Sequence, residues 1–501
     1  MTAIHPEASV LATRRGKLTL LFVCAVAFLD FVDASIVNVA LPSIRHDLHF
    51  SVQNLQWVLS GYLLTYGGFL LLGGRSADLL GRRRVLVAGI SVFALSSLMG
   101  GLAPDPGVLI GARLMQGFGA AMMLPAALSI LTTTFSEGTD RLKALGVWGA
   151  VAGIASAVGV LLGGILSQEL GWRWVLFVNL PLCVVLLISS FRIVTAERRT
   201  ASLTHFDLFG AATVTGGMLL LIYTLIRVPE VGWGNWRSIA GLFGSAVLLI
   251  AFIFNEVRHP RPLLPLSIFR IKGLGAADAT QVISMAGFYS MFFFVTLYMQ
   301  NVLHFSPLRA GVSYVPVTLG VAASAGISSK LFERVGTRPI IVGGSLVAAS
   351  GVYWLSQIPV NGTYLSDLLP GLMIMSIGLG AVFTGVTTAA NAGVPPDKAG
   401  LAAGLVNTSQ WFGAALGLAI FSSIATSRTN QLLTEHISAP LALTQGFHRA
   451  LLASSLFLLG AAVIAMRATN TRGEPTTPVD DLEGFDERLD RRADLNLQAS
   501  G

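Results

Sequence analysis

Fourteen apolar runs of about 20 residues recur along nearly the whole chain, and each is long enough to cross the roughly 30 Å hydrocarbon core of a bilayer. Charged residues make up only 12% of the chain, about half the share usual in soluble domains. We therefore predict an all-α integral membrane protein. The predicted spans cover residues 18–41, 55–74, 85–104, 108–133, 143–167, 173–193, 208–227, 236–256, 274–300, 308–329, 338–357, 367–391, 400–425 and 449–467.

The first run begins at Leu18, behind Arg14, Arg15 and Lys17. It is too long for a removable signal peptide and lacks a small-residue cleavage site, so we interpret it as the first span. The sequence from about Thr469 onward is polar and has no apolar period, which predicts a disordered cytoplasmic tail.

Positive charge is distributed unequally over the loops. Alternate loops, with the N-terminal segment, hold twenty Lys and Arg residues, whereas the opposite loops hold seven. Because cytoplasmic loops are enriched in Lys and Arg, both termini are predicted to be cytoplasmic and the multi-pass protein to lie in the cell inner (plasma) membrane. This loop pattern accounts for the net charge of +7 without a nucleic-acid partner.

Motifs for enzyme chemistry are absent. The sequence has no Gly-x-x-x-x-Gly-Lys-Ser/Thr phosphate loop, no His-Glu-x-x-His zinc site and no Cys-x-x-Cys pair, so we expect no metal, no cofactor and no ATP-driven step. Cys24 and Cys183 both fall inside predicted spans and are interpreted as small apolar fillers. If the protein moves a solute across the membrane, the energy would therefore have to come from an ion gradient.

The chain also contains a repeat. The loop 74–84 after the second span is similar to residues 330–338 after the tenth, with Asp78 matching Glu333 and Gly81 matching Gly336. Two six-helix halves separated by two additional helices give this offset of eight spans, and such repeats place a substrate site between the halves. The predicted organisation is an N-terminal segment 1–17, a six-helix bundle 18–200, two linker helices 201–260, a second six-helix bundle 261–468 and a tail 469–501.

Four segments carry a family resemblance. They are residues 33–42 (DASIVNVALP), the loop 74–84, residues 113–121 (RLMQGFGAA) and residues 171–181 (GWRWVLFVNLP). Together they resemble the major facilitator superfamily, and within it the fourteen-helix drug:proton antiporter branch, over residues 15–467. The resemblance implies a fold of fourteen transmembrane helices, arranged 6+2+6 with two pseudo-symmetric halves.

The sequence departs from the branch at three places. Val160 follows Gly159 where the fifth-helix motif normally has proline, and Ser76 and Leu79 replace the usual leucine and arginine of the loop motif. Residues 407–411 (NTSQW) stand where an arginine and a glutamine are common.

Two acids lie near the middle of the first span. Asp30 and Asp33 are three residues apart and share a helical face. An ionised carboxylate at bilayer depth costs about 2.5 to 3.5 kcal/mol on insertion scales, and burial disfavours its charged form, as a proton carrier requires. We predict proton coupling at Asp33, which matches the branch signature, and at Asp30. The alternative is a carboxyl group that is only hydrogen-bonded within the bundle.

Arg113 is the matching buried cation, in the fourth span. By resemblance it assists proton transfer, and the alternative is a fixed ion pair that only orients two helices. In the loop 74–84, Gly74, Asp78, Gly81, Arg82 and Arg83 are predicted to form a conformational latch that exists in one access state only. The alternative is a basic loop that only determines the topology, and the two roles do not exclude each other.

The remaining site candidates face a helix interface or a cavity. Gly159, Gly163 and Gly164 give the fifth span a small-residue face for close packing, which the resemblance suggests is a gate. Asp278 opens the ninth span and is interpreted as interfacial. Aromatic and amide side chains suited to a promiscuous apolar pocket, each of which ordinary packing would also explain, are Asn38, Tyr62, Tyr66, Gln116, Tyr289, Phe293, Asn407, Gln410 and Trp411.

These features predict a monomeric, proton-coupled antiporter that exports small amphipathic compounds, drugs or antibiotics, by alternating access. Its partners would be protons, the organic substrate and the lipid bilayer. Two alternatives remain: a proton-coupled symporter that imports a nutrient on the same fold, and a membrane receptor or scaffold that has lost transport.

Overall fold

The computed structural model describes residues 10–135, 139–195, 207–259, 262–264, 266–394 and 399–472. These residues form helices and connecting loops, and no strand occurs among them. The long helices are α1 (Arg14–Leu48), α3 (Trp57–Leu80), α4 (Arg82–Gly101), α5 (Pro106–Thr134), α6 (Thr139–Glu169), α8 (Asn179–Ile193), α9 (Leu208–Val231), α10 (Trp236–Arg258), α11 (Leu274–Asn301), α13 (Val315–Val335), α14 (Thr337–Leu355), α15 (Leu369–Asn391), α16 (Ala399–Thr434) and α17 (Ala439–Ala465).

Six short elements join or extend these helices: η1 (Val10–Ala12), α2 (Val52–Leu55), α7 (Trp174–Phe177), η3 (Leu266–Arg270), α12 (Pro307–Ser313) and η4 (Tyr364–Leu368). Each predicted span corresponds to one long helix, so the expectation of an all-α protein with fourteen long helices is confirmed. In the described part of the chain, 12 helical segments are long and apolar enough to cross a membrane. The other two long helices, α3 and α16, pack against each other inside the bundle.

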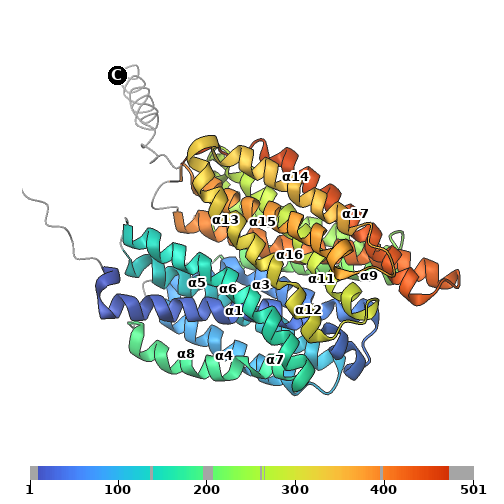
Figure 1. Ribbon diagram of the computed structural model, residues 1–501. Helices are drawn as coiled ribbons and strands as arrows, with labels where there is room; N and C mark the ends of the chain where they lie inside the picture. Colours follow the sequence, from blue (N-terminus) through green and yellow to red (C-terminus); the bar gives the residue numbers. More distant parts are fainter. Residues whose placement is uncertain are drawn as a thin grey trace, which may run out of the picture.

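The two halves of the bundle repeat the same packing. In the first half α3 and α4 pack on α5, and α1 packs on α6; in the second half α13 and α14 pack on α15, and α11 packs on α16. Figure 1 shows the first half, α1 to α8, lying beside the second half, α11 to α17. The loops after α3 and α13 both turn at a glycine with positive φ, Gly81 at 96° and Gly336 at 83°, which other residues rarely adopt. The chain therefore folds as two similar six-helix units.

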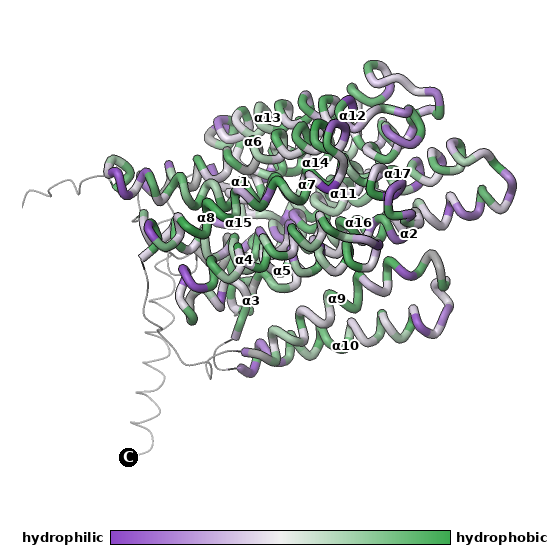
Figure 2. Tube along the Cα trace, turned by 90° about the horizontal axis from the view of Figure 1, so that it is seen from below, coloured by the Kyte–Doolittle hydropathy of each residue, from purple (hydrophilic) through white to green (hydrophobic). Residues whose placement is uncertain are grey.

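Helices α9 and α10 form a hairpin along one side of the bundle (Figure 2). Helix α9 packs on both α3 and α16, and the Thr215 hydroxyl donates to the Gly68 carbonyl at 2.7 Å. Phe252 of α10 shares a buried apolar cluster with Ala277 of α11 and Val386 of α15. On α10 the apolar side chains of Ile239, Phe243 and Ile250 are 56%, 70% and 65% exposed. An apolar face of that kind is stable only against lipid or another apolar surface. The protein is thus a multi-pass membrane protein in which α9 covers the seam between the halves.

Candidate functional site

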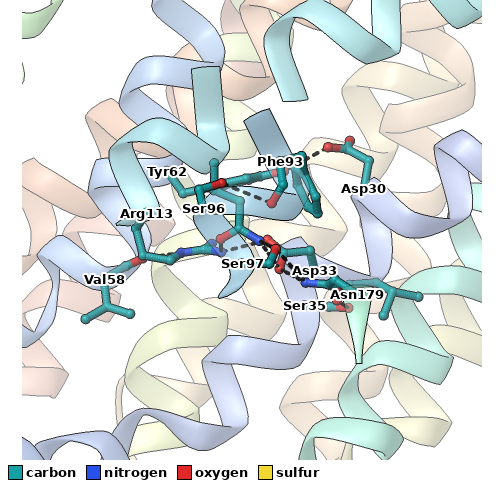
Figure 3. A network of polar contacts seen from close by, with 12 residues as sticks. Asp30, Asp33, Ser35, Val58, Tyr62, Phe93, Ser96, Ser97, Arg113 and Asn179 are labelled. Atoms are coloured by element: carbon teal, nitrogen blue, oxygen red, sulfur yellow. Dashed lines mark hydrogen bonds and ion pairs between the residues drawn. The ribbon is translucent and has the colours of Figure 1, made fainter. Parts of the chain in front are cut away.

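Asp33 lies at the centre of a buried polar network in the first half of the bundle (Figure 3). Its Oδ2 forms an ion pair with Arg113 Nη1 at 2.7 Å, and its Oδ1 accepts hydrogen bonds from Gln116 Nε2 at 2.8 Å and Asn179 Nδ2 at 2.7 Å. The carboxylate and the guanidinium are both inaccessible to solvent. The negative charge of Asp33 can be buried because three donors, from α5 and α8, replace the hydrogen bonds that water would otherwise make with the carboxylate.

Arg113 has further partners besides Asp33. Its Nη1 donates to Gln116 Oε1 at 2.6 Å, one turn along α5, and its Nε donates to the Val58 carbonyl of α3 at 2.9 Å. The guanidinium carbon lies 4.3 Å from the centre of the Tyr62 ring, within the range of a cation–π contact. These contacts fix the guanidinium beside Asp33 from three directions.

Asp30 is bound separately from Asp33. Its two carboxyl oxygens accept hydrogen bonds from the Tyr62 hydroxyl at 2.8 Å and the Tyr66 hydroxyl at 2.7 Å, and Asp30 is fully buried. Since the ring of Tyr62 also lies against Arg113, this one side chain contacts both acid sites. The structure therefore brings Asp30, Asp33 and Arg113 into one connected network.

Two members of the network were not among the sequence candidates. Asn179 donates to Asp33, and Ser97 Oγ of α4 accepts a hydrogen bond from Gln116 Nε2 at 2.8 Å. Asn179 stands in the motif 171–181, which could have pointed to it. Ser97 has no such signal, because a serine in an apolar helix is ordinary.

Trp411 of α16, in the second half of the bundle, contacts the network through Tyr66, which donates to Asp30. Its ring stacks on Tyr66 at 4.4 Å between centres and lies 6.2 Å from Phe31 and 5.9 Å from Tyr289. These four rings come from α1, α3, α11 and α16. An aromatic wall shared by both halves thus adjoins the Asp30 carboxyl group.

A small central pocket opens beside this wall. Its cavity volume is about 10 Å³, close to the smallest space that holds a water molecule, so an organic molecule enters only if the helices separate. Asn38 of α1 lines it, and its Oδ1 has no hydrogen-bond partner within the described ranges. The other lining residues are Ala34, Leu59, Tyr62, Leu63, Arg113, Tyr289, Phe292 and Leu418.

The remaining cavity candidates lie away from this pocket. Phe293 is buried 5.3 Å from Phe294 and lines a different cavity, described below. Gln410 is buried on α16 and Asn407 is half-buried one turn before it. The structure thus brings Asn38, Tyr62 and Tyr289 together at the central pocket and leaves these three outside it.

The loop 74–84 is held within the first half. Arg82 Nη1 donates to Thr133 Oγ1 at 3.0 Å, and Arg83 Nη1 donates to the Val194 carbonyl at 3.3 Å. A methyl group at Gly74 would make only ordinary contact with Pro125, at 3.6 Å. The tight approach of α3 to α5 lies one residue earlier, at Gly73. The side chain of Asp78 lies outside the described residues, as do the N-terminal residues 1–9 and the tail from residue 473.

The glycines of α6 contact two different partners. A Cβ at Gly159 or Gly163 would overlap the backbone of α1 near Val32 and Ile36, within the same half. A Cβ at Gly164 would lie 2.9 Å from Leu308 Cα of α12, across the seam between the halves. Only Gly164 of the three therefore lies where the two halves meet.

The sequence suggests that Asp278 is an interfacial residue, but the structure buries its side chain among the helices. Its side chain is only 6% exposed in α11, and neither carboxyl oxygen has a hydrogen-bond partner among the described residues. Gln281, one turn further, is fully buried and its amide is also without a partner there. The adjacent Ala277 belongs to a buried apolar cluster with Val386 of α15 and Leu405 of α16.

The Asp33–Arg113 ion pair and the Asp30 carboxyl group are buried in a bundle of apolar helices, beside a pocket that two similar halves enclose. This arrangement is typical of a membrane transporter. No group of three His, Cys, Asp or Glu side chains that could hold a metal occurs within the described ranges.

Comparison with known proteins identifies the family. The model of the Major Facilitator Superfamily matches residues 23–418. The chain is 37% identical to the puromycin resistance protein pur8 of Streptomyces alboniger, over 91% of this chain and 92% of that protein. It is also 37% identical to the cephamycin export protein CmcT of Amycolatopsis lactamdurans, over 90% and 92%. The chain belongs to the Major Facilitator Superfamily.

Solved structures agree on the fold. A bacterial homologue of the human lysosomal transporter Spinster superposes with a TM-score of 0.65 at 16% identity, covering 91% of this chain and 97% of that one. A D-xylose-proton symporter superposes with a TM-score of 0.63 at 12% identity, covering 92% and 99%. These similarities concern the fold alone, since the sequences are far apart.

Proposed function

We propose that this transporter is a proton-coupled antiporter that exports small amphipathic organic compounds, drugs or antibiotics, by alternating access. The observation that carries the proposal is the buried network of Asp33, Arg113 and Asp30 beside an aromatic wall built from both halves. The antibiotic resistance and export functions named for the relatives support the direction and the class of substrate.

In this mechanism Asp33 is the proton carrier. Ionised, it is held by Arg113, Gln116 and Asn179. Protonation removes the charge that attracts Arg113, which frees the guanidinium to move and loosens the contact of α1 with α5. Asp30 and its tyrosines couple this change to the aromatic wall, because Tyr62 contacts Arg113 and Asp30, and Tyr66 stacks on Trp411. A substrate against that wall would thus sense the protonation state.

The other assignments belong to the same proposal. The loop 74–84 acts as a latch in one access state, Gly164 forms part of a gate at the seam, and the substrate contacts Asn38, Tyr62, Tyr66, Tyr289 and Trp411. The protein works as a monomer in the inner membrane with both termini in the cytoplasm.

The test is proton movement in liposomes that contain the purified protein, with an imposed pH gradient and a panel of puromycin, lincomycin, a cephamycin and lipophilic dyes. We expect substrate-triggered proton release in the wild type and none in Asp33→Asn. The matched control is Asp105→Asn, at the N-cap of α5 outside the network, where Asn can also cap the helix. Proton co-entry with substrate would instead establish a symporter, and no coupled flux with any compound would leave the receptor alternative.

A further inference from the structure

A second cavity, which we call the outer pocket, lies at the end of the bundle where α1 and α16 end and α3 and α17 begin. Its volume is about 190 Å³, and an apolar cavity of roughly 150 Å³ already accommodates a benzene ring. Both halves contribute to it: Arg45 and Gln56 come from the first, and the other lining residues come from α11, α16 and α17. These are Phe293, Phe294, Leu297, Ser422, Ala425, Thr426, Thr429, Asn430, Leu433, Ala439, Leu443 and Phe447.

The outer pocket continues the central pocket along four shared helices. On α16, Leu418 lines the central pocket and Ser422, one turn on, lines the outer pocket. On α11 the central pocket is lined by Tyr289 and Phe292, and the outer pocket by residues that follow them, as far as Leu297. The lining also passes from Leu59 to Gln56 at the start of α3, three residues apart, and from Asn38 to Arg45 on α1, two turns apart. The two pockets are therefore consecutive spaces along the seam between the halves.

Unpaired polar atoms line this path. Gln56 and Ser422 are 2% and 3% exposed, and neither Gln56 Oε1 nor Ser422 Oγ has a hydrogen-bond partner among the described residues. In the central pocket Asn38 Oδ1 is likewise without a partner in that part of the chain. Burying a polar atom without a partner is costly, so such atoms at a cavity indicate a bound water or ligand that completes them. Arg45 adds a positive charge to the same outer pocket, and Phe293, Phe294 and Phe447 supply apolar faces.

We propose that the outer pocket is a second binding site, which an amphipathic compound occupies after it leaves the central pocket. Its ligand carries an apolar ring that packs on the phenylalanines, a hydrogen-bond donor for Gln56 Oε1 and an anionic or neutral acceptor near Arg45. The role as a release site rests on the proposed export function, whereas binding itself does not.

The probe is 7-hydroxycoumarin-3-carboxylate, a fluorescent ring with one donor and one carboxylate, titrated into the protein in lipid nanodiscs without a gradient. Ala425→Trp fills the outer pocket, and we expect it to weaken binding at least tenfold. Gln56→Leu removes the acceptor, so the variant should bind the probe and its 7-methoxy analogue equally, whereas the wild type prefers the probe about fivefold or more. Leu456→Trp, on a side chain that is 59% exposed on α17, is the control and should bind like the wild type.

Wild-type affinity in Ala425→Trp would overturn the proposal, as would an unchanged preference in Gln56→Leu. If Ala425→Trp does not fold, Ser422→Leu fills the same space with less added volume and decides the question. Asp33→Asn should keep the outer site, since Asp33 does not line it. Failure of proton coupling with intact probe binding would therefore reject the antiport mechanism alone, and loss of the site with intact coupling would reject this inference alone.

Discussion

The intact Asp33–Arg113 pair contributes little net free energy to stability, but removing one of its partners is strongly destabilising. Taking two charges out of water is expensive, and their attraction in a dry bundle roughly repays that cost. Removing one partner leaves the other charge buried and unpaired, which costs about 3 to 5 kcal/mol. In the proposed mechanism the pair matters because it differs between ionised and protonated Asp33. Its effects on stability and on transport can be separated by substitution.

Arg113→Met should lower the free energy of unfolding by about 3 to 5 kcal/mol and stop transport, because Asp33 keeps only its neutral donors. The double variant Arg113→Met/Asp33→Asn should recover most of the stability and none of the transport. Thermal unfolding in nanodiscs and dye efflux measure the two effects. A double variant as unstable as the single one would contradict the analysis.

Asp278→Asn should raise the free energy of unfolding by about 1 to 3 kcal/mol, because the buried carboxylate has no partner to lose and a neutral amide is less costly to bury. Asp367→Asn is the matched comparison. Its carboxylate accepts hydrogen bonds from Thr363 N at 2.6 Å and Ser366 Oγ at 2.7 Å, so the same change there should destabilise. Equal shifts of the melting temperature for both variants would refute this assignment for Asp278.

At the scale of helices, pairs of glycines four residues apart allow one helix of each half to pack closely against its neighbour. Gly159 and Gly163 let α6 approach the α1 backbone, and Gly413 and Gly417 do the same for α16 on α11 near Val282. The two helix pairs occupy corresponding places in the repeat. Small residues at such positions let helices approach closely in lipid, where no hydrophobic driving force draws them together.

Gly163→Ala should therefore lower stability by about 1 to 3 kcal/mol, because its Cβ would overlap the Ile36 carbonyl. Gly149→Ala on the same helix is the control, since nothing lies within 4 Å of an added Cβ there. That change should be neutral or stabilise by up to about 1 kcal/mol through helix propensity. The comparison of melting temperatures tests whether α6 is packed as described.

Across the whole molecule, the halves meet at the end of the bundle opposite the start of α1. Gln300 Nε2 of α11 donates to the Val39 carbonyl of α1 at 2.9 Å, and α12 packs on α6 at the same end. These contacts close that end. A hydrogen bond that exists in one access state only biases the equilibrium by its own free energy.

Gln300→Leu should thus increase the population with this end open, by roughly fivefold for a hydrogen bond worth about 1 kcal/mol. Distances between spin labels at Gln168→Cys and His304→Cys would report the shift. Tyr364→Phe is the control, because the Tyr364 hydroxyl bonds to the Ser313 carbonyl within one half at 2.7 Å. An unchanged distance distribution in Gln300→Leu would show that this bond does not distinguish the states.

The sequence predicted the helices well, because a run of 20 apolar residues has few alternatives in lipid. It missed the length of α1 and α16, which extend past the predicted spans to Leu48 and Thr434, since hydropathy does not mark a helix that continues beyond the bilayer. It singled out Asp33 and Arg113 because buried charges are costly. It missed Ser97, because a serine costs little to bury and so gives no signal. It did not predict that Asp278 is buried, because the position of a residue along a helix does not reveal which neighbouring helices cover its side chain.

Asp30, Asp33 and Arg113 belong to α1 and α5, whereas Trp411 and Tyr289 belong to the other half. In the proposed mechanism the groups that carry the proton are thus encoded in the first half of the chain, and two of the four rings of the aromatic wall are encoded in the second. Under the proposed mechanism, substitutions in α11 and α16 would change which compounds are accepted while Asp30, Asp33 and Arg113 stay unchanged. A lineage that meets new toxic compounds would then change its export spectrum through a few codons of the second half.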